Sequence, residues 1–281
     1  MINNSILTGI VTFNPDLEVL HSSLQSLLFQ RTPVLIVDNG SKNKSGIDEL
    51  VKSIDGGIIR IVFNAKNQGI AAALNQIMSY GKRIGAEWVL TLDQDSICPK
   101  DYIKSMKEYF DIEPNIGIVA PLIVDRNVGV IGHNPHDDYA LVRTCITSGA
   151  FTKTKCWDAV GKYDAKMFID SVDFEFCYRM RKAGYKVIQT SKVKLEHSLG
   201  EGHIVSLFGI RFRNNEHSAF RCYYIAQNNI YYPLKHHLWI HLLRGNVRNI
   251  KHIFIVLLYE KNKSNKIKAI VKGWTKGWTL R

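Results

Sequence analysis

Two carboxylates one residue apart, Asp93 and Asp95, directly follow an apolar run at residues 88–92. Such a run predicts a buried parallel strand, and parallel strands place their ligand sites at the carboxyl end. Carboxylate oxygens in that position suit Mg²⁺ or Mn²⁺ that bridges a diphosphate. Because an Asp-x-Asp pair is also common by chance, its interpretation depends on the other polar groups of the chain.

A second acidic cluster contains Asp170, Asp173 and Glu175, where the sequence predicts the start of a helix. Asp173 can act as a general base that takes a proton from an attacking hydroxyl, a role that typically contributes about 10²–10⁴-fold to a rate. It can equally be only the N-cap of the helix. Glu175 and Arg179 are four residues apart, a spacing at which an ion pair stabilises a helix without any catalytic role.

Asp38 ends another predicted strand and opens the turn Asp-Asn-Gly-Ser. A carboxylate there can accept the imide N–H of uracil or thymine, which would reject bases that lack this donor. The alternative is that Asp38 only holds the turn, since this tetrapeptide forms turns unaided.

A helix is predicted to begin at Gly69, just after Asn67 and a third predicted strand. Glycine at this point lets the helix N-terminus approach an anionic nucleotide closely. Asn67 can contact that ligand or can only cap the helix. His197 lies just beyond a later predicted strand; its imidazole can complete the coordination of a metal, although a lone histidine is more often a surface or core residue.

These polar groups depend on strands that alternate with helices. Apolar strands are predicted at residues 6–12, 34–37, 58–63 and 88–92, and apolar residues recur at helical spacing at 17–28 and 70–78. Helices are predicted at about 99–110 and 173–184, and further strands at 116–121, 141–147, 187–188 and 192–197. This order predicts an α/β fold with a doubly wound, Rossmann-like sheet.

Composition sets limits on the class of protein. At 281 residues the chain can bury the core of one large domain with an appendage. Its five cysteines are odd in number and have no Cys-x-x-Cys spacing, which favours reduced thiols in a cytosolic compartment over a disulfide scaffold or a zinc site. We expect no signal peptide and no membrane span, because no basic segment precedes an apolar stretch at the start and no apolar run is long enough.

The net charge of +12 is concentrated at one end of the chain. Residues 201–281 contain fourteen Lys and Arg against three Asp and Glu, which leaves a net charge of only +1 for the first two hundred residues. We therefore expect two regions, the α/β domain at 1–204 and a basic, mainly helical region at 205–281. A basic segment favours an anionic partner such as nucleic acid, an acidic membrane surface or a diphosphate-bearing substrate.

Two helices are predicted near the end of this basic region. The first carries apolar residues at 250, 253, 254, 257 and 258; the second carries Ile267, Ile270, Val271, Trp274 and Trp278 on one face and three lysines on another. A basic amphipathic helix with tryptophans fits an anionic membrane interface. The alternative is that these helices pack on the protein itself, with the lysines in solvent. Gly273 and Gly277 count against the second helix.

In this order, the residues resemble the family 2 inverting glycosyltransferases of GT-A fold, over about residues 5–200. The resemblance rests on the motifs 37–41 (VDNGS), 67–69 (NQG) with Asn75, 93–96 (DQDS), 147–150 (TSGA), 173–175 (DFE) with Arg179, and His197. The segments 93–96 and 168–175 look most like the bacterial rhamnosyltransferase branch. Residues 221–229 are similar to the R-x-Y-Y-x-x-R-N segment of that branch, although Gln227 stands where the branch usually has arginine.

The resemblance implies a role for each matched position. Asp173 would be the catalytic base; Asp170 is the alternate, because Val172 stands where the family usually has Glu before its Asp. Asp93, Asp95 and His197 would hold a divalent metal, Mg²⁺ or Mn²⁺. The acceptor and the sugar would meet Ser148, Gly149, Glu175 and Arg179. The nucleotide sugar would be bound by Thr12, Asn14, Asp38, Asn67, Gly69, Asn75, Asp93 and Gln94.

The implied activity is transfer of L-rhamnose from dTDP-L-rhamnose to a hydroxyl of a lipid-linked glycan, as in O-antigen or other cell-surface polysaccharide biosynthesis. The enzyme would work in the cytoplasm, peripherally at the inner face of the plasma membrane. A hexosyltransferase that uses a UDP-sugar is the alternative within the family, since thymine and uracil share the imide. A non-catalytic protein that binds nucleotide sugars or anionic surfaces is the alternative of another class.

Two further classes are disfavoured by the motifs. A nucleotidyltransferase would need a Gly-rich, Arg-bearing loop after the first strand, and residues 12–15 (TFNP) lack it. A nucleic-acid partner is not expected, because no recognised binding module accompanies the basic charge. An oligomer is possible, and the sequence does not specify its state.

Overall fold

The computed structural model describes residues 5–54, 57–125, 129–196, 203–207, 210–214 and 216–280. The chain forms two compact units. The first contains Met1–Ala165 and Asp173–Ser198, and the second contains Lys166–Val172 and Leu199–Arg281. The short segment Lys166–Val172 therefore belongs to the second unit, although both of its flanks belong to the first.

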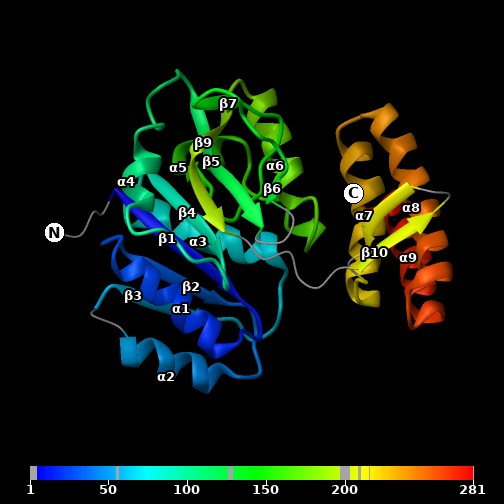
Figure 1. Cartoon of the computed structure of the whole chain (residues 1–281), viewed down its shortest axis with the longest axis horizontal. Helices are drawn as coiled ribbons and strands as arrows, with labels where there is room; N and C mark the ends of the chain where they lie inside the picture. Colours follow the sequence, from blue (N-terminus) through cyan, green and yellow to red (C-terminus); the bar gives the residue numbers. More distant parts are fainter. Residues whose placement is uncertain are drawn as a thin grey trace. The chain divides into compact units, whose positions relative to one another are not determined.

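A mixed sheet forms the centre of the first unit (Figure 1). Its strands are β1 (Ile6–Thr12), β2 (Val34–Asp38), β3 (Ile59–Phe63), β4 (Trp88–Asp93), β5 (Ile116–Asp125), β6 (Gly129–Ile131), β7 (Tyr139–Leu141), β8 (Phe151–Lys153) and β9 (Lys186–Glu196). They lie in the order β3-β2-β1-β4-β8-β5-β9-β7, and β6 pairs with β5. The strands β3, β2, β1 and β4 are parallel to one another.

The register of the parallel strands brings their polar carboxyl ends together. Thr12 of β1 lies opposite Asp38 of β2, and Val11 lies opposite Asp93 of β4. β1 lies between β2 and β4, so the strand order reverses at β1. In open α/β sheets, ligands bind beyond the carboxyl ends of the strands at such a point. The predicted strands at 6–12, 34–37, 58–63 and 88–92 agree with the structure to within one residue.

Helices cover both faces of this sheet. They are α1 (Leu17–Leu28), α2 (Lys44–Ile54), α3 (Ile70–Arg83), α4 (Tyr102–Lys107), α5 (Thr154–Ala159) and α6 (Val172–Lys182), with a 3₁₀ turn at Ala165–Met167. Apolar residues of α1, α2 and α4 share one core with Ile6, Ile10 and Leu90. Helix α3 packs on the other face, where a Cβ at Gly9 would meet Ile77. Alternation of side chains along β1 explains why neighbouring residues face different helices.

Some of the predicted elements are wrong, and some of the observed elements were not predicted. The strand predicted at 141–147 is wrong: β7 is Tyr139–Leu141, and the chain beyond it is irregular. The reason is that this stretch turns back onto β4, where the Thr91 hydroxyl donates to the Thr147 carbonyl at 2.7 Å. Helix α4 is shorter than the predicted 99–110, and α2, α5 and β8 were not predicted.

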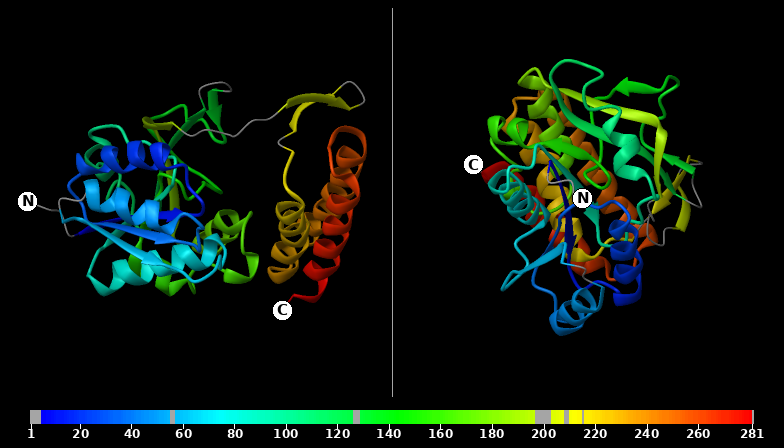
Figure 2. Two further views of the ribbon diagram at one scale, coloured as in Figure 1. Left: turned by 90° about the horizontal axis from the view of Figure 1, so that it is seen from below. Right: turned by 90° about the vertical axis from the view of Figure 1, so that its left-hand side faces the viewer.

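The second unit is mainly helical, as expected for the basic region. It contains the antiparallel hairpin β10 (His203–Leu207) and β11 (Ile210–Asn214), which was not predicted, and three helices, α7 (Ala219–Lys235), α8 (Trp239–Tyr259) and α9 (Lys263–Thr279). Figure 2 shows these helices alongside one another, coloured from gold to red. Their shared core contains Cys222, Ala226, Val256 and Ile270.

Glycine lets α8 and α9 approach α7 closely. A Cβ at Gly245 would lie 1.9 Å from the carbonyl oxygen of Asn229, and one at Gly273 would lie 2.0 Å from that of Tyr223. The glycines that counted against the last helix are therefore what allows it to pack. Within the described part of the chain, no helix is both long enough and apolar enough to cross a membrane.

Candidate active site

Asp38 lies fully buried at the end of β2. Its Oδ1 accepts from the hydroxyls of Thr12 and Ser41, and its Oδ2 accepts from the amides of Gly40 and Ser41. A carboxylate offers about four acceptor positions, so these contacts use its capacity. The structure therefore gives Asp38 the turn-holding role that the sequence offered as an alternative, and contact with a base stays a prediction.

The loop after β1 is tied to its neighbours by side chains from both sides. Asn14, which has a positive φ of 48°, accepts from the amide of Lys42 at 2.8 Å, and its own amide donates to the Ser41 hydroxyl at 2.7 Å. The amide of Phe13 donates to Oε1 of Gln94 at 2.9 Å. Asn14 and Gln94 thus hold the loop after β1 in place, and Gln94 does so from the loop that carries Asp93 and Asp95. Their predicted contact with the nucleotide sugar stays a prediction.

An asparagine network joins the loop after β2 to the start of α3. Asn39, which is buried, donates to Asn67 Oδ1 at 2.9 Å and accepts from Asn64 at 3.2 Å. Asn67 Oδ1 also accepts from the amide of Gly69, whose φ of 87° favours glycine. Asn67 and Gly69 therefore form the expected helix start, whereas the roles of Asn39 and Asn64 were missed. The only signal for them was the recurrence of asparagine at strand ends.

Asn75 of α3 makes hydrogen bonds inside the first unit through both its amide nitrogen and its amide oxygen. Its Nδ2 donates to the carbonyl of Tyr163 at 2.8 Å, and its Oδ1 accepts from Trp157 Nε1 at 3.1 Å and from the Tyr163 amide at 2.9 Å. These bonds fasten the segment after α5 to α3. The structure thus provides a packing role for Asn75, and its predicted contact with the nucleotide stays a prediction.

The loop of Ser148 and Gly149 lies directly against the acidic end of β4. The Ser148 hydroxyl accepts from the amide of Asp93 at 3.2 Å and lies 2.9 Å from the Ser96 hydroxyl. A Cβ at Gly149 would lie 2.6 Å from Leu195 and 2.8 Å from the Tyr102 hydroxyl, so a larger residue would displace this loop. Two of the predicted groups, Asp93 and Ser148, are therefore in contact.

The carboxylates at the end of β4 fit a hard divalent cation. Asp93 is half-buried and Asp95 is exposed, and both supply the oxygen ligands that Mg²⁺ and Mn²⁺ prefer. The third predicted ligand, His197, lies outside the described residues. Among the residues that are described, no group of three or more His, Cys, Asp or Glu is placed to hold a metal ion. The other coordination positions of a cation at Asp93 and Asp95 would therefore be filled by that histidine, by water or by a substrate phosphate.

The acidic residues on α6 differ sharply in surroundings. Glu175 is fully buried and accepts from Arg179 at two points, each at 2.8 Å; the same guanidinium also donates to the carbonyls of Val160 and Lys162. This is the ion pair that the spacing indicated, and the predicted contact of Glu175 and Arg179 with the acceptor or the sugar stays a prediction. Asp173 is half-buried at the first turn, and its Oδ1 accepts from the amide of Phe174 at 2.9 Å.

The charge of Asp173 acts on neighbouring acids. The pKa of the Cys145 thiol is raised chiefly by its hydrogen bond to Cys177, and the pKa of the Tyr163 hydroxyl is raised chiefly by burial. The negative charge of Asp173 raises both pKa values further. Both groups are therefore neutral at physiological pH, and neither offers a second charge or nucleophile at this point. The general-base role of Asp173 stays a prediction.

Asp170, the alternate base, is held within the second unit. Its carboxylate accepts two hydrogen bonds from the guanidinium of Arg221. The adjoining backbone is fixed by Asn228, whose Nδ2 donates to the carbonyls of Met167, Ile169 and Asp170. Sequence reasoning noted Arg221 and Asn228 as parts of a motif, but nothing in the sequence paired them with this segment.

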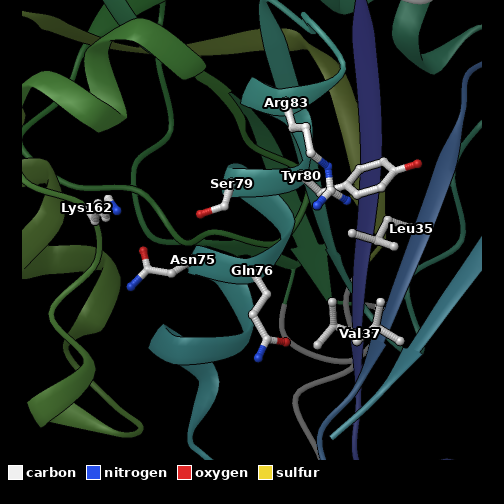
Figure 3. Close-up of a pocket in the computed structure, with 9 residues that line it drawn as sticks. Leu35, Val37, Asn75, Gln76, Ser79, Tyr80, Arg83 and Lys162 are labelled. Atoms are coloured by element: carbon white, nitrogen blue, oxygen red, sulfur yellow. The ribbon is translucent and has the colours of Figure 1, made fainter.

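A pocket of about 500 Å³ opens elsewhere on the first unit, along α3 and the face of β2 and β3 (Figure 3). Arg83 lies over the ring of Tyr80 there, 4.8 Å from its centroid. Of the predicted donor-binding residues, only Asn75 lines it. The pocket is thus distinct from the strand-end groups that carry the predicted chemistry.

The family model described as glycosyl transferase family 2 matches residues 8–169, more than half of the chain. The dTDP-rhamnosyl transferase RfbF of Shigella flexneri is 30% identical over 282 residues, covering 95% of this chain and 93% of that protein. This match therefore extends over both the sheet and the helical region.

Solved structures share the fold at low sequence identity. TarS of S. aureus in complex with UDP-GlcNAc superposes with a TM-score of 0.62 at 14% identity, covering 95% of this chain and 80% of that one. The mannosyltransferase PcManGT from Pyrobaculum calidifontis, in complex with GDP-Man and Mn²⁺, superposes with a TM-score of 0.59 at 12% identity, covering 99% and 76%. The chain therefore belongs to glycosyl transferase family 2, has the GT-A fold and is a glycosyltransferase.

Proposed function

We propose that this enzyme transfers L-rhamnose from dTDP-L-rhamnose to a hydroxyl of a lipid-linked glycan, with inversion at the anomeric carbon. The observation that carries the proposal is the 30% identity to a dTDP-rhamnosyl transferase over nearly the whole of both chains. The aligned strand ends support it, since they bring Thr12, Asp38 and Asp93 to one edge of the sheet.

The donor is proposed to bind beyond the carboxyl ends of these strands. The amides and carbonyls of the loop after β2 and of the start of α3 would surround the base and ribose, with Asn67 and Gly69 at the helix N-terminus. Asp38 shapes this wall through its four hydrogen bonds, so any contact with the imide of the base requires it to exchange one of them. A base without this N–H would give Asp38 no hydrogen bond in return for the one it gives up, so such a base would bind more weakly.

Asp173 is the proposed general base. It would take the proton of the acceptor hydroxyl as that oxygen attacks the anomeric carbon from the side opposite the diphosphate. One displacement inverts the carbon and needs no enzyme nucleophile. The hydrogen-bond pattern supports Asp173 over Asp170, because both oxygens of Asp170 are engaged by Arg221. Ser148 and Gly149 would border the sugar, and Glu175 and Arg179 would hold α6 in place.

Asp93 and Asp95 would hold a divalent metal, with His197 as the further ligand. When bound, such a cation neutralises charge on a departing diphosphate. Mn²⁺ accompanies the donor GDP-Man in the PcManGT structure, and the oxygen ligands of this chain suit either Mn²⁺ or Mg²⁺.

We also propose that the enzyme works in the cytoplasm, peripherally at the inner face of the plasma membrane, in the assembly of O-antigen or a related surface polysaccharide. A lipid-linked acceptor would be presented at that face. The excess of basic residues in the second unit supports contact with an anionic surface.

Isothermal titration calorimetry with a panel of donors tests the donor assignment. The protein is titrated with dTDP-L-rhamnose, dTDP-glucose and UDP-hexoses, each with Mn²⁺ and with EDTA. Tightest binding of dTDP-L-rhamnose in the presence of Mn²⁺ is expected. Preference for a UDP-hexose would be consistent with a glycosyltransferase but would replace dTDP-L-rhamnose as the assigned donor. Binding of no nucleotide sugar would overturn the proposal.

A further inference from the structure

The outward face of α8 carries a continuous row of large apolar side chains. The row consists of Ile240, Leu243, Val247, Ile250, Phe254 and Leu257, which are between 45% and 67% exposed. Their spacing alternates between three and four residues, so they lie along one face over nearly the whole helix. Exposed apolar surfaces of this extent usually mark a binding site.

Packing within the unit does not use this row. The opposite side of α8 is buried, with Leu242, Gly245, Asn249 and Val256 directed inward. There the Asn249 side chain donates to the Ala226 carbonyl at 3.1 Å, and Gly245 lies against Asn229. The helix is thus already attached through its other face.

The apolar face of α9, for which the sequence suggested membrane contact, packs partly inside the unit. Ile270 is buried in the core of the unit, and Trp274 donates from Nε1 to Asn246 Oδ1 at 2.9 Å. Val271 and Trp278 remain about half-exposed. Of these two helices, α8 therefore carries the larger exposed apolar face.

The surrounding charge indicates what covers the row. Residues 239–280 contain nine Lys and Arg but only one carboxylate, Glu260, which pairs with Lys266 at 2.8 Å. On α8 itself, Arg244 lies one turn after Ile240 and Lys251 one turn after Val247, and both are exposed. The basic residues therefore flank the row on one side.

The same three-and-four spacing is found in helix pairs, so a second copy of the chain is the competing occupant. Such pairs are normally supported by opposite charges beside the seam. Helix α8 has no acidic residue, so a second copy would bring like charges together. Anionic lipid headgroups supply the missing opposite charge.

We infer that α8 lies flat on an anionic lipid surface, with the apolar row in the boundary between headgroups and acyl chains. Arg244, Arg248 and Lys251 bind lipid phosphates, and Trp239, which is 64% exposed, occupies the interface at the start of the helix. The purpose of this contact rests on the proposed function, because a lipid-linked acceptor is presented at the same surface.

Vesicle flotation of the full-length protein tests the inference. Vesicles of phosphatidylcholine are compared with vesicles of phosphatidylcholine mixed with phosphatidylglycerol. The wild type should float with the mixed vesicles and much less with the neutral ones. In the double variant Leu243→Gln/Phe254→Gln, the partition coefficient should fall by at least about tenfold, because both side chains enter the acyl boundary.

Matched controls separate this effect from general loss of hydrophobicity or charge. Phe29→Gln changes an apolar residue that is 64% exposed on the first unit, and flotation should be unchanged. Arg244→Gln/Lys251→Gln should lower binding to the mixed vesicles by about tenfold or more, whereas Lys104→Gln/Lys107→Gln, which removes the same charge from α4, should not. Thermal melts check that all variants fold.

Three results would overturn the inference. They are no flotation of the wild type, flotation that the α8 variants do not change, and a dimer in sedimentation velocity that the apolar variants dissociate while vesicle binding is absent. Donor calorimetry on the wild type is kept separate. Vesicle binding without donor binding would support the membrane contact of α8 and contradict the proposed function. Donor binding without vesicle binding would support the proposed function and contradict the membrane contact of α8.

Discussion

Arg221 holds Asp170 at two points, from Nε to Oδ2 at 3.1 Å and from Nη2 to Oδ1 at 2.9 Å. Asn228, seven residues later on the same helix, donates to three backbone carbonyls of the same segment. Helix α7 thereby fixes residues 166–172, three of which (Phe168, Asp170 and Ser171) have positive φ. The segment ends one residue before the proposed base, Asp173.

Substitution Asn228→Ala should destabilise the protein by about 1–3 kcal/mol, because it leaves carbonyl oxygens near α7 without their donor. Asn265→Ala, at an exposed position of α9, should change the free energy of unfolding by less than about 0.5 kcal/mol. Urea unfolding followed by circular dichroism measures both. Equal effects of the two substitutions would contradict the role given to Asn228.

The two candidate bases can be separated by amide variants. Asp173→Asn should lower kcat by about 10²–10⁴-fold with little change in donor affinity. Asp170→Asn should retain most of the rate, because its carboxylate is occupied by Arg221 and not by a substrate. Initial rates of nucleotide release and calorimetric donor binding provide the comparison. A larger loss of kcat in Asp170→Asn than in Asp173→Asn would make Asp170 the general base and would contradict the assignment of Asp173.

A methyl group at Gly273 should disrupt the contact between α9 and α7. The added Cβ would lie 2.0 Å from the Tyr223 carbonyl oxygen, and overpacking of this kind typically costs about 1–3 kcal/mol. We expect Gly273→Ala to lower Tm, although alanine favours helix formation in isolation. Thr275→Ala, exposed on the same helix, is the matched control. An unchanged or raised Tm in Gly273→Ala would show that the helices are not packed as described.

Local patterns were enough to predict the first half of the sheet. The strands before Pro15, Asp38 and Asp93 are short apolar runs closed by residues that form turns, and both signals are properties of neighbouring residues. The polar groups at the ends of β1, β2 and β4 followed from the rule that parallel strands align their carboxyl ends. The strand order and register were not predicted from these runs, and the binding roles of these polar groups stay predictions.

The contacts that connect distant segments were not predictable. Nothing local to Asp170 indicates a partner on α7, and nothing local to Asn39 indicates that it contacts Asn67. The outward row on α8 was also missed as such, because periodicity predicts an amphipathic helix but not which of two helices is buried. Gly273 illustrates the difference: propensity alone counts it against a helix, whereas tertiary packing requires it.

The second unit should lose stability in mild acid. Burial lowers the pKa of His217 and of His252 below the usual 6.5, an effect that the charge of Glu260 partly opposes in both cases. Both histidines are therefore neutral in the fold and take up protons more readily when unfolded. Their contribution to stability is complete above the unfolded pKa of about 6.5 and is lost as the pH falls through the folded pKa.

We therefore expect Tm to fall between about pH 7.5 and pH 5.5, and expect His252→Gln to reduce this dependence. His241→Gln, at an exposed position of α8, should leave the dependence as in the wild type. Differential scanning calorimetry across this range makes the comparison. A pH dependence that His252→Gln does not alter would show that this histidine does not contribute to it.

The most direct test of the proposed function is a transfer assay with dTDP-L-rhamnose, Mn²⁺ and an extract of bacterial lipid-linked glycans. Release of dTDP is measured for the wild type and for Asp173→Asn, with Asp111→Asn, an exposed carboxylate of the first unit, as the control. We expect acceptor-dependent release that EDTA abolishes, that Asp111→Asn retains and that Asp173→Asn loses. Release from UDP-hexoses but not from dTDP-L-rhamnose, or release that survives in Asp173→Asn, would contradict the account.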